Sequence, residues 1–207
     1  IVGNTMSDLG AGGVKIGGSA AVPDRDLVSS AGAAAGGARR RTGRARVTDN
    51  EIRSFGRVFS SAAGILVRHA FSNTLAHNHI HDGFYTGISV GWVWGYGPSV
   101  TRDNRIEKNH IHDIGQGLLS DMGGVYTLGS QPGSVVRGNL IHDVRSAGYG
   151  GWGIYPDEGS THVVIEDNVV YRTSSQAFHQ HYGNENTVRN NVFAFGGQGT
   201  IALSRAP

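Results

Sequence analysis

Two adjacent carboxylates, Asp157 and Glu158, stand in the segment GGWGIYPDEGS, among glycines and aromatic residues. A third acid, Asp121, lies in the segment LLSDMGGVY. Two carboxyl groups about 5 to 10 Å apart across a groove can hydrolyse a glycosidic bond: one protonates the leaving oxygen, and the other attacks the anomeric carbon or activates water. We therefore take Asp121, Asp157 and Glu158 as candidate catalytic residues. The alternative for the last two is an exposed turn before Gly159.

Aromatic and imidazole side chains supply candidate substrate contacts. Trp92 and Trp94, in GWVWGYG, have flat faces that can stack on sugar rings, although packing of this loop on its neighbour would also explain them. His179 and His181, in HQHYGNEN, could bind sugar hydroxyls or transfer protons, or could be solvated surface groups. Tyr126 and Tyr155 complete the predicted substrate-binding set. Burial beside these tyrosines or Trp152 would raise the pKa of an acid catalyst.

A sequence repeat determines which elements hold these residues. Six segments share an apolar residue, two mostly polar residues, an asparagine, any residue and a second apolar residue. Their asparagines are Asn50, Asn78, Asn109, Asn139, Asn168 and Asn191, separated by 28, 31, 30, 29 and 23 residues, with a degenerate earlier copy at Asn4. This period, with β-type alternation and no helical pattern, predicts the coils of a parallel β-helix. We expect each asparagine at a left-handed corner, with its amide bonded to the next coil.

Stacking the coils predicts two internal columns and a functional outer face. One column is Ile52, Ile80, Ile111, Ile141, Val170 and Phe193, and the other is Val14, Ile65, Ile88, Val125, Ile154 and Phe178. Strand alternation then turns the next residue outward. The outward rows are Lys15, Leu66, Ser89, Tyr126, Tyr155 and His179, followed two positions on by Gly17, Arg68, Gly91, Leu128, Asp157 and His181. The candidate residues thus gather on the C-terminal half of one face, flanked by loops of variable length.

A row of histidines forms a third candidate feature. His81, His112 and His142 occupy equivalent repeat positions, and each is followed by an aspartate. Imidazoles beside carboxylates can bind a metal. However, residues stacked one per coil run parallel, whereas metal ligands must converge. The sequence therefore favours a structural ladder, and we predict no metal and no other cofactor.

Composition limits the remaining possibilities. The 207 residues include 33 glycines and no cysteine, with a net charge of +2. These totals favour a single all-β domain over residues 1–207 and exclude disulfides and thiolate metal sites. The low-complexity stretch at about 17–46 is predicted to be a solvated insertion, because its arginines lack interleaved aromatics. We expect no nucleic-acid partner, no membrane span and a monomer.

Several long segments resemble the right-handed β-helix proteins of glycoside hydrolase family 141. They are SDMGGVYTLGSQPGSVVRGNLIHDV, GGWGIYPDEGS, FHQHYGNENTVRNNVFAF, GISVGWVWGYGPS and NHIHDIGQGLLSDMGG. The likeness covers residues 47–195, and SDLGAGGVKIG extends it to the start. It implies a single right-handed parallel β-helix of about seven coils, similar to pectate lyases in fold. Because family members are longer, it also implies that this chain is a piece of a longer protein.

The resemblance also implies an activity. Relatives cleave plant-type polysaccharides, with α-L-fucosidase and xylanase activities, and use two aspartates that match Asp121 and Asp157 here. The protein would then be secreted, periplasmic or on the cell surface, with a polysaccharide or oligosaccharide as its partner. This sequence departs from the pattern at the 17–46 insertion and at Pro156, which lacks an N–H and loses one inter-coil hydrogen bond.

Two other functions are compatible with such a fold. A polysaccharide lyase or epimerase needs cations to neutralise a uronate, and the predicted face offers only Lys15 and Arg68, far from Asp157 in coil order. A non-catalytic carbohydrate-binding β-helix would bind glycans without cleaving them. An unsaturated product would indicate the first alternative, and binding without turnover would indicate the second.

Overall fold

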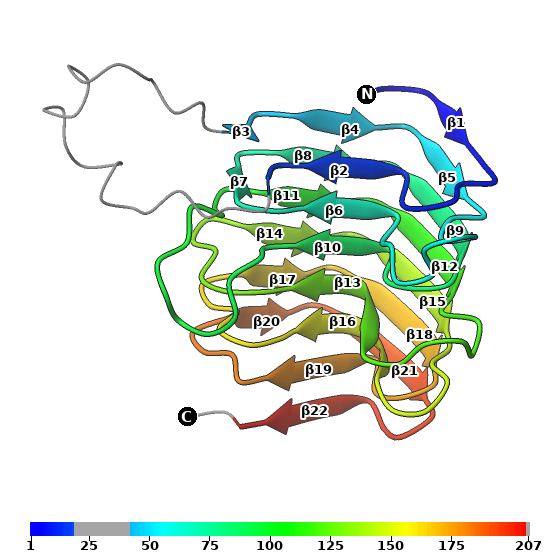
Figure 1. Ribbon diagram of the computed structural model, residues 1–207. Helices are drawn as coiled ribbons and strands as arrows, with labels where there is room; N and C mark the ends of the chain where they lie inside the picture. The colour runs from blue at the N-terminus through cyan, green and yellow to red at the C-terminus, as the bar shows by residue number, and fades with distance from the viewer. Residues whose placement is uncertain (19–41, 206–207) are drawn as a thin grey trace, which may run out of the picture.

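The protein is a stack of parallel β-coils (Figure 1). A computed structural model describes residues 1–18 and 42–205, and every regular element in these residues is a strand. Six coils contribute a strand to each of three sheets, and the first coil contributes strands to two of them; every strand pair is parallel, with partners in neighbouring coils. The prediction of an all-β parallel β-helix is confirmed, and the seven-stranded sheets match the expected number of coils.

The chain enters sheet I first, then sheet II and then sheet III. Sheet I contains β1 (Thr5–Met6), β5 (Glu51–Arg53), β9 (His79–Gly83), β12 (His110–Ile114), β15 (Leu140–Val144), β18 (Val169–Thr173) and β21 (Val192–Gly196). Sheet II contains β2 (Val14–Ile16), β6 (Ile65–Val67), β10 (Ile88–Val90), β13 (Met122–Thr127), β16 (Gly151–Pro156), β19 (Phe178–His181) and β22 (Ile201–Ser204). Sheet III contains β4 (Arg46–Thr48), β8 (Thr74–Ala76), β11 (Arg105–Glu107), β14 (Val135–Arg137), β17 (Val164–Glu166) and β20 (Thr187–Arg189). A short sheet pairs β3 (Thr42–Gly43) with β7 (Ala70–Phe71).

Both predicted apolar columns form the core. In sheet I, Ile80 pairs with Ile111 and Ile111 with Ile141, and in sheet II, Ile88 pairs with Val125. The members of both columns are buried, except Phe193, which is half-buried near the last coil. The apolar residues of each coil therefore pack against those of the coils on either side, which a single coil could not provide for itself.

A ladder of asparagine side chains joins the coils along one corner. Each Nδ2 donates to the Oδ1 of the asparagine in the next coil, from Asn4 through Asn191, at 2.9 to 3.0 Å. The predicted bonds are confirmed, but the predicted backbone conformation is wrong. The left-handed residue is the one before each asparagine, such as Lys108 (φ 53°), since the asparagine backbone N–H must point at the next Oδ1.

A second, shorter ladder was not predicted. Asn73 Nδ2 donates to Asn104 Oδ1 at 2.8 Å, and the Asn104 backbone N–H donates to Ser134 Oγ at 3.2 Å. These side chains are fully buried at the corner where the chain enters sheet III. Only two asparagines take part, so the pattern is too short to stand out in the sequence.

Glycines make the corner where sheets I and II meet. Gly13, Gly64, Gly87, Gly124 and Gly153 each precede an inward residue of sheet II. A Cβ on Gly87 would lie 2.5 Å from Ile111 Cγ2, and one on Gly153 would lie 2.0 Å from Val170 Cγ1. The sheet I column thus occupies the space that a side chain would need, which explains the recurring glycine before the second apolar stretch.

The predicted insertion is described only at its ends. Residues 19–41 lie outside the described residues, so the prediction stays untested there. At the other end, Thr42–Gly43 and Arg46–Thr48 belong to strands β3 and β4 rather than to a loop. No helix in residues 1–18 and 42–205 is long and apolar enough to span a bilayer.

Replacing Asn109 by alanine tests the role of the ladder. The substitution leaves the Asn78 backbone and side-chain N–H groups without their acceptor inside the stack. We expect the free energy of unfolding to fall by about 3 kcal/mol, since each buried group left unpaired costs about 1–3 kcal/mol. Asn191→Ala, at the exposed end of the ladder, is the matched control and should cost less, because water replaces the lost partner. Equal losses in urea unfolding would contradict this account.

Candidate functional site

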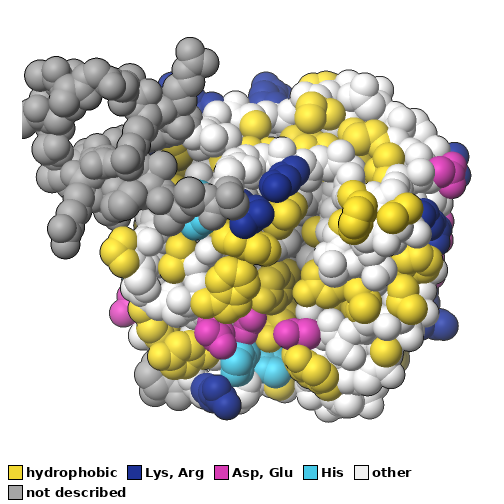
Figure 2. All heavy atoms as spheres, viewed as in Figure 1, with side chains coloured by type: hydrophobic (Ala, Val, Ile, Leu, Met, Phe, Trp, Pro, Cys, Tyr) yellow, Lys and Arg dark blue, Asp and Glu magenta, His cyan; other side chains and the backbone are white. Residues whose placement is uncertain are grey.

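The outer face of sheet II carries the predicted rows. Ser89 pairs with Tyr126, and Tyr126 pairs with Tyr155, so these side chains stack in adjacent coils. Figure 2 shows this face hollowed, with hydrophobic side chains along the hollow and acidic and histidine side chains gathered at its lower end. The gathering of carboxylates and imidazoles on one half of the face agrees with the sequence prediction.

Strands β13 and β16 bend as they cross the glycine corner. Figure 1 shows β13 turning sharply between its two ends. Trp152 and Tyr155 are three residues apart, a spacing that would put them on opposite faces of a flat strand. Their ring centroids nevertheless lie 4.1 Å apart in one outer cluster with Tyr126 and Leu128. The bend at Gly153 therefore brings the start of the strand round to the same face as its end.

Asp157 is buried and held by two neighbours. Only 6 % of the residue is exposed, although it follows directly after β16. Its Oδ2 accepts a hydrogen bond from the Tyr126 hydroxyl at 2.6 Å, and its Oδ1 lies 2.8 Å from His181 Nδ1. Burial, followed by the nearby Asp157 charge, raises the pKa of Tyr126, so this hydroxyl remains a donor. The predicted turn before Gly159 does form, since the Ser160 N–H donates to Asp157 O at 2.8 Å, but Asp157 is buried rather than exposed.

Asp121 reaches the site from the opposite end of the neighbouring strand. It precedes β13 with a left-handed backbone (φ 58°), and its N–H donates to Tyr149 O at 3.3 Å. The Tyr85 hydroxyl donates to the Asp121 backbone carbonyl at 2.8 Å. Burial raises the pKa of the Asp121 carboxyl, and the Asp157 charge raises it further; hydrogen bonding from Tyr149 and Tyr155 acts in the opposite direction.

One cavity of about 320 Å³ joins these groups. Its lining includes eight of the nine predicted site residues: Trp94, Asp121, Tyr126, Tyr155, Asp157, Glu158, His179 and His181. Tyr149 and Trp152 complete the wall. Glu158 is half-buried at this cavity, so the structure brings all three candidate acids together.

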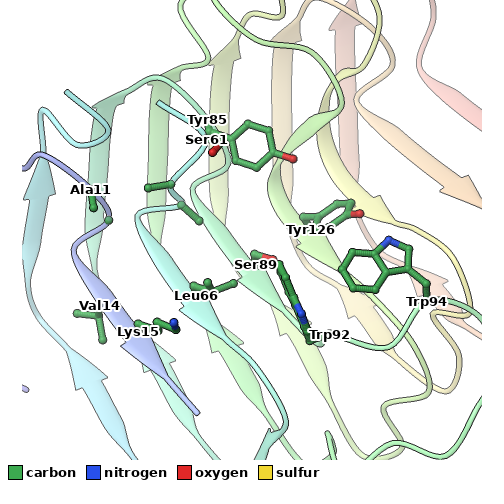
Figure 3. A pocket seen from close by; sticks show the side chains of 13 residues that line it. Ala11, Val14, Lys15, Ser61, Leu66, Tyr85, Ser89, Trp92, Trp94 and Tyr126 are labelled. Atoms are coloured by element: carbon green, nitrogen blue, oxygen red, sulfur yellow. The ribbon is translucent and has the colours of Figure 1, made fainter. Parts of the chain in front are cut away.

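The ninth residue, Trp92, lies in an adjoining cavity of about 480 Å³ (Figure 3). Trp94 and Tyr126 line both cavities, so the two hollows share a wall. The Arg68 guanidinium lies over the Trp92 ring, 3.9 Å from its centroid. Trp94 therefore lies beside the acids and Trp92 in the adjoining cavity, and the stacking of either ring on a sugar stays a prediction.

The loop that carries Trp94 is fixed to later coils. The Glu158 carbonyl accepts hydrogen bonds from the N–H groups of Gly95, at 3.3 Å, and Gly129, at 3.1 Å. The Tyr96 hydroxyl donates to Tyr182 O at 3.0 Å. The backbone of Glu158 thus holds the aromatic loop over the cavity, a role that no sequence pattern indicated.

The two predicted histidines differ in their surroundings. His181 contacts Asp157 directly, whereas His179 Nε2 lies 2.8 Å from Ser204 Oγ, and His179 Nδ1 is buried without a partner. The His179 ring packs edge-on against Trp152, with centroids 4.4 Å apart. Burial and the neighbouring His181 lower the pKa of His179, which keeps this imidazole neutral at pH 7.

Two site tyrosines were missed. Tyr149 lies in the loop before β16 and Tyr85 in the loop before β10, at the same rim as Asp121. Burial, with a contribution from the Asp121 charge, raises the pKa of Tyr85 to about 12. Both tyrosines stand in loops that precede strands of sheet II, as Asp121 does, but the register offsets them from Asp121 by one residue, so no repeat pattern marks them.

The coupling between the aspartates can be measured directly. Since the Asp157 charge raises the pKa of Asp121, Asp157→Asn should lower that pKa. Carboxyl-detected NMR titration of the wild type and the variant provides the measurement. Asp103→Asn removes a carboxylate whose side chain is 55 % exposed, beside Arg102, and should leave the Asp121 titration unchanged. An unchanged Asp121 titration in Asp157→Asn would show that the two groups do not interact.

Comparison with known proteins places this chain. A solved structure named "Glycoside hydrolase" superimposes with a TM-score of 0.78 and 26 % sequence identity, over 95 % of this chain and 32 % of that protein. The chain thus spans less than half of this relative, and the predicted resemblance to a glycoside hydrolase of this fold is confirmed. No curated protein matches the chain. The family model described as "Right handed beta helix region" matches residues 1–206, so the chain belongs to the right-handed β-helix family.

Proposed function

We propose that the protein hydrolyses glycosidic bonds, with Asp121 as the proton donor and Asp157 as the nucleophile or general base. The observation that carries the proposal is that two aspartates from adjacent coils line one aromatic cavity in different environments. The similarity to a solved glycoside hydrolase supports it at the level of activity class. Two-carboxylate hydrolysis needs two such groups across one cavity, one as proton donor and the other as nucleophile or general base.

Asp121 suits the role of acid. Burial and the charge of Asp157 both raise its pKa, so the carboxyl keeps its proton to higher pH than an exposed aspartate. Its backbone is held at two points, since its N–H donates to Tyr149 O and its carbonyl accepts from the Tyr85 hydroxyl, while Tyr149 and Tyr155 hydrogen-bond its carboxyl group. Asp121 lines the cavity in which a leaving-group oxygen would lie.

Asp157 suits the partner role. Tyr126 and His181 contact different oxygens of its carboxyl group, which fixes the plane of the group. A nucleophile or base must be oriented in this way before substrate binds. In the proposed mechanism, the Tyr126 hydroxyl and His181 hold Asp157 in position, and Glu158 serves at the rim rather than in the chemistry.

The aromatic wall suits a carbohydrate ligand. Trp94, Tyr155 and Trp152 line the cavity with their rings, and sugar rings have apolar faces that stack on such surfaces. By resemblance, the substrate would be a plant-type polysaccharide cleaved in a fucosidase- or xylanase-like reaction. A partner of this class agrees with the expected absence of nucleic-acid and membrane binding.

The lyase or epimerase alternative is less well supported. Among the described residues, no lysine or arginine lines the cavity around Asp121 and Asp157, while Lys15 lines the adjoining cavity. A lyase needs cationic groups at the uronate carboxylate. A non-catalytic, carbohydrate-binding role does not call for a carboxyl group as buried and as fixed in orientation as that of Asp157.

Reducing-sugar release from a panel of defined polysaccharides tests the proposal. On a responsive glycan, Asp121→Asn and Asp157→Asn should each lower kcat/KM by at least about 100-fold, the scale of general acid–base catalysis. Glu158→Gln is the matched control, since it removes a neighbouring carboxylate of the same cavity, and should cost less than about tenfold. Unchanged turnover in either aspartate variant would refute the assignment.

A leaving-group series assigns the two roles. A nitrophenolate leaves without needing a proton. A nitrophenyl glycoside of the matching sugar should therefore reduce the loss of kcat/KM in Asp121→Asn by about tenfold or more. Asp157→Asn should gain nothing, because its substitution affects attack rather than departure. Rescue of Asp157→Asn alone would reverse the two assignments.

A further inference from the structure

The outer face of sheet I carries a histidine cluster that the proposed reaction does not use. The predicted row stacks as expected: the rings of His81, His112 and His142 are parallel, with successive centroids 5.0 Å apart. Each Nδ1 lies within 2.8 Å of the following aspartate's Oδ2. Because the aspartate accepts the Nδ1–H, the Nε2 of each neutral ring carries a lone pair.

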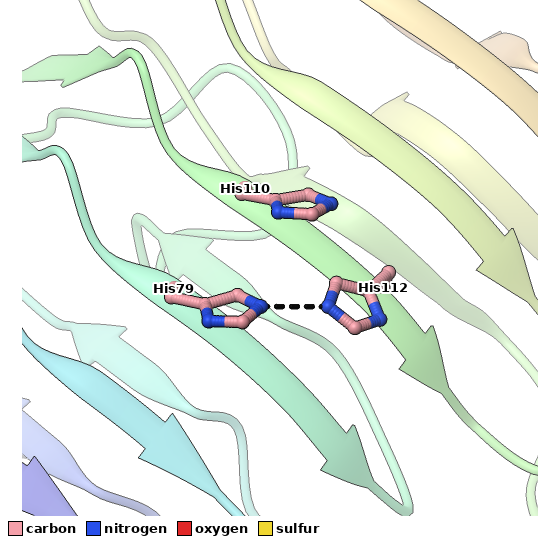
Figure 4. Close-up of side chains that lie close together, drawn as sticks. All are labelled: His79, His110 and His112. Atoms are coloured by element: carbon pink, nitrogen blue, oxygen red, sulfur yellow. Dashed lines mark hydrogen bonds between the residues drawn. The ribbon is translucent and has the colours of Figure 1, made fainter.

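A second row, His79 and His110, supplies donors to those lone pairs. His79 Nε2 lies 2.7 Å from His112 Nε2, and His110 Nε2 lies 2.8 Å from His142 Nε2. In Figure 4, the dashed line joins the first pair, and the second ring nitrogen of His79 faces away from His110. Since His79 donates through Nε2, its Nδ1 has a lone pair and no bond to either of these rings.

The first histidine of the row, His81, lacks such a donor. Glu51 pairs with His79 in the strand register and so takes the place that a donor histidine would occupy beside His81. Glu51 Oε1 lies 3.5 Å from His81 Nε2, and this nitrogen is buried without a hydrogen-bond partner. In the neutral tautomer set by Asp82, a lone pair on His81 Nε2 faces a carboxylate oxygen of Glu51. Either a proton on Nε2 or a metal ion bound between the two atoms would satisfy both of them.

We propose that Glu51, His79 and His81 form a binding site for a divalent first-row transition-metal ion, with Zn²⁺ as the ion that this donor set suits. One ligand atom from each residue lies within 4.8 Å of the other two. Ligands about 2.0–2.1 Å from a tetrahedral zinc lie roughly 3.3–3.4 Å apart, close to the His81–Glu51 separation. Two imidazoles and one carboxylate leave a coordination position for water.

The surroundings of the site act as an outer shell. Asp82 orients His81, and the His79–His112–Asp113 chain orients His79, in the manner of carboxylate–imidazole pairs behind metal ligands. Arg53 Nε lies 3.8 Å from Glu51 Oε1, and its side chain is 44 % exposed, so the guanidinium can move aside when an ion binds. The histidine row thus differs from the purely structural stack expected from the sequence only where Glu51 meets His81.

A second trio, His79, His110 and His112, also has ligand atoms within 4.8 Å of one another. An ion there must replace the His79–His112 hydrogen bond, whereas an ion at Glu51 that takes the Nδ1 of His79 leaves that bond in place. The trio that contains Glu51 is therefore the stronger site. The two share His79 and differ in Glu51 and His110, which makes them separable by mutation.

Zinc titration of the untagged protein by calorimetry tests the proposal. We expect one Zn²⁺ per chain, with Glu51→Gln and His81→Gln each weakening the affinity by at least about tenfold. Asp82→Asn should weaken it by about tenfold through the orientation of His81. His110→Gln is the matched control: it removes a ligand of the second trio alone and should leave the affinity unchanged. Circular dichroism confirms that each variant is folded.

Three outcomes would overturn the proposal. They are a wild-type affinity weaker than about 1 mM, full binding by Glu51→Gln, and loss of binding in His110→Gln but not in Glu51→Gln. The first is expected if His81 is an imidazolium paired with Glu51 and Asp82. Because the site lies on sheet I, glycan turnover by the aspartate variants of sheet II is an independent measurement, and failure of one proposal leaves the other standing.

Discussion

The stacking of one coil on the next, secured by buried asparagine amides, is the constraint on which the rest of the structure depends. Each amide in the ladder accepts from the backbone and side chain of the coil before it and donates to the coil after it. This fixes the register of sheet I, and the glycine corner transmits that register to sheet II. A shift of one residue would turn the tyrosines and Asp157 inward and the core isoleucines outward.

The positions of both candidate aspartates depend on this register. Asp121 precedes one strand and Asp157 follows the next, so on flat strands the two would stand far apart. The bend at the glycine corner brings the half-buried Asp121 and the buried Asp157 to one cavity, where the charge of Asp157 raises the pKa of Asp121. Loops add the remaining parts: the aromatic loop of Trp94 is held by the Glu158 carbonyl, and Tyr149 closes the rim.

The repeat made most of the fold predictable. Asparagine spacing and apolar alternation identified both columns and the outward rows, because a coil that stacks on a copy of itself must repeat its inward residues. Three features were beyond this reasoning. The burial of Asp157 depends on Tyr126 and His181 from neighbouring coils, the left-handed residue precedes rather than occupies each asparagine, and Trp92 belongs to a second cavity. Each depends on how a loop or bend packs in three dimensions, which the local pattern does not specify. The break in the histidine ladder at Glu51 became visible only once the hydrogen bonds fixed which ring nitrogens carry protons.

A double-mutant cycle on glycan hydrolysis tests the central claim, that Asp121 and Asp157 act on one bond as a pair. Groups that act as a unit lose their effect together, so the double variant Asp121→Asn/Asp157→Asn should be no slower than the slower single variant, within about threefold. If the two losses instead multiply, the aspartates act independently, and the site described here is not a two-carboxylate hydrolytic centre.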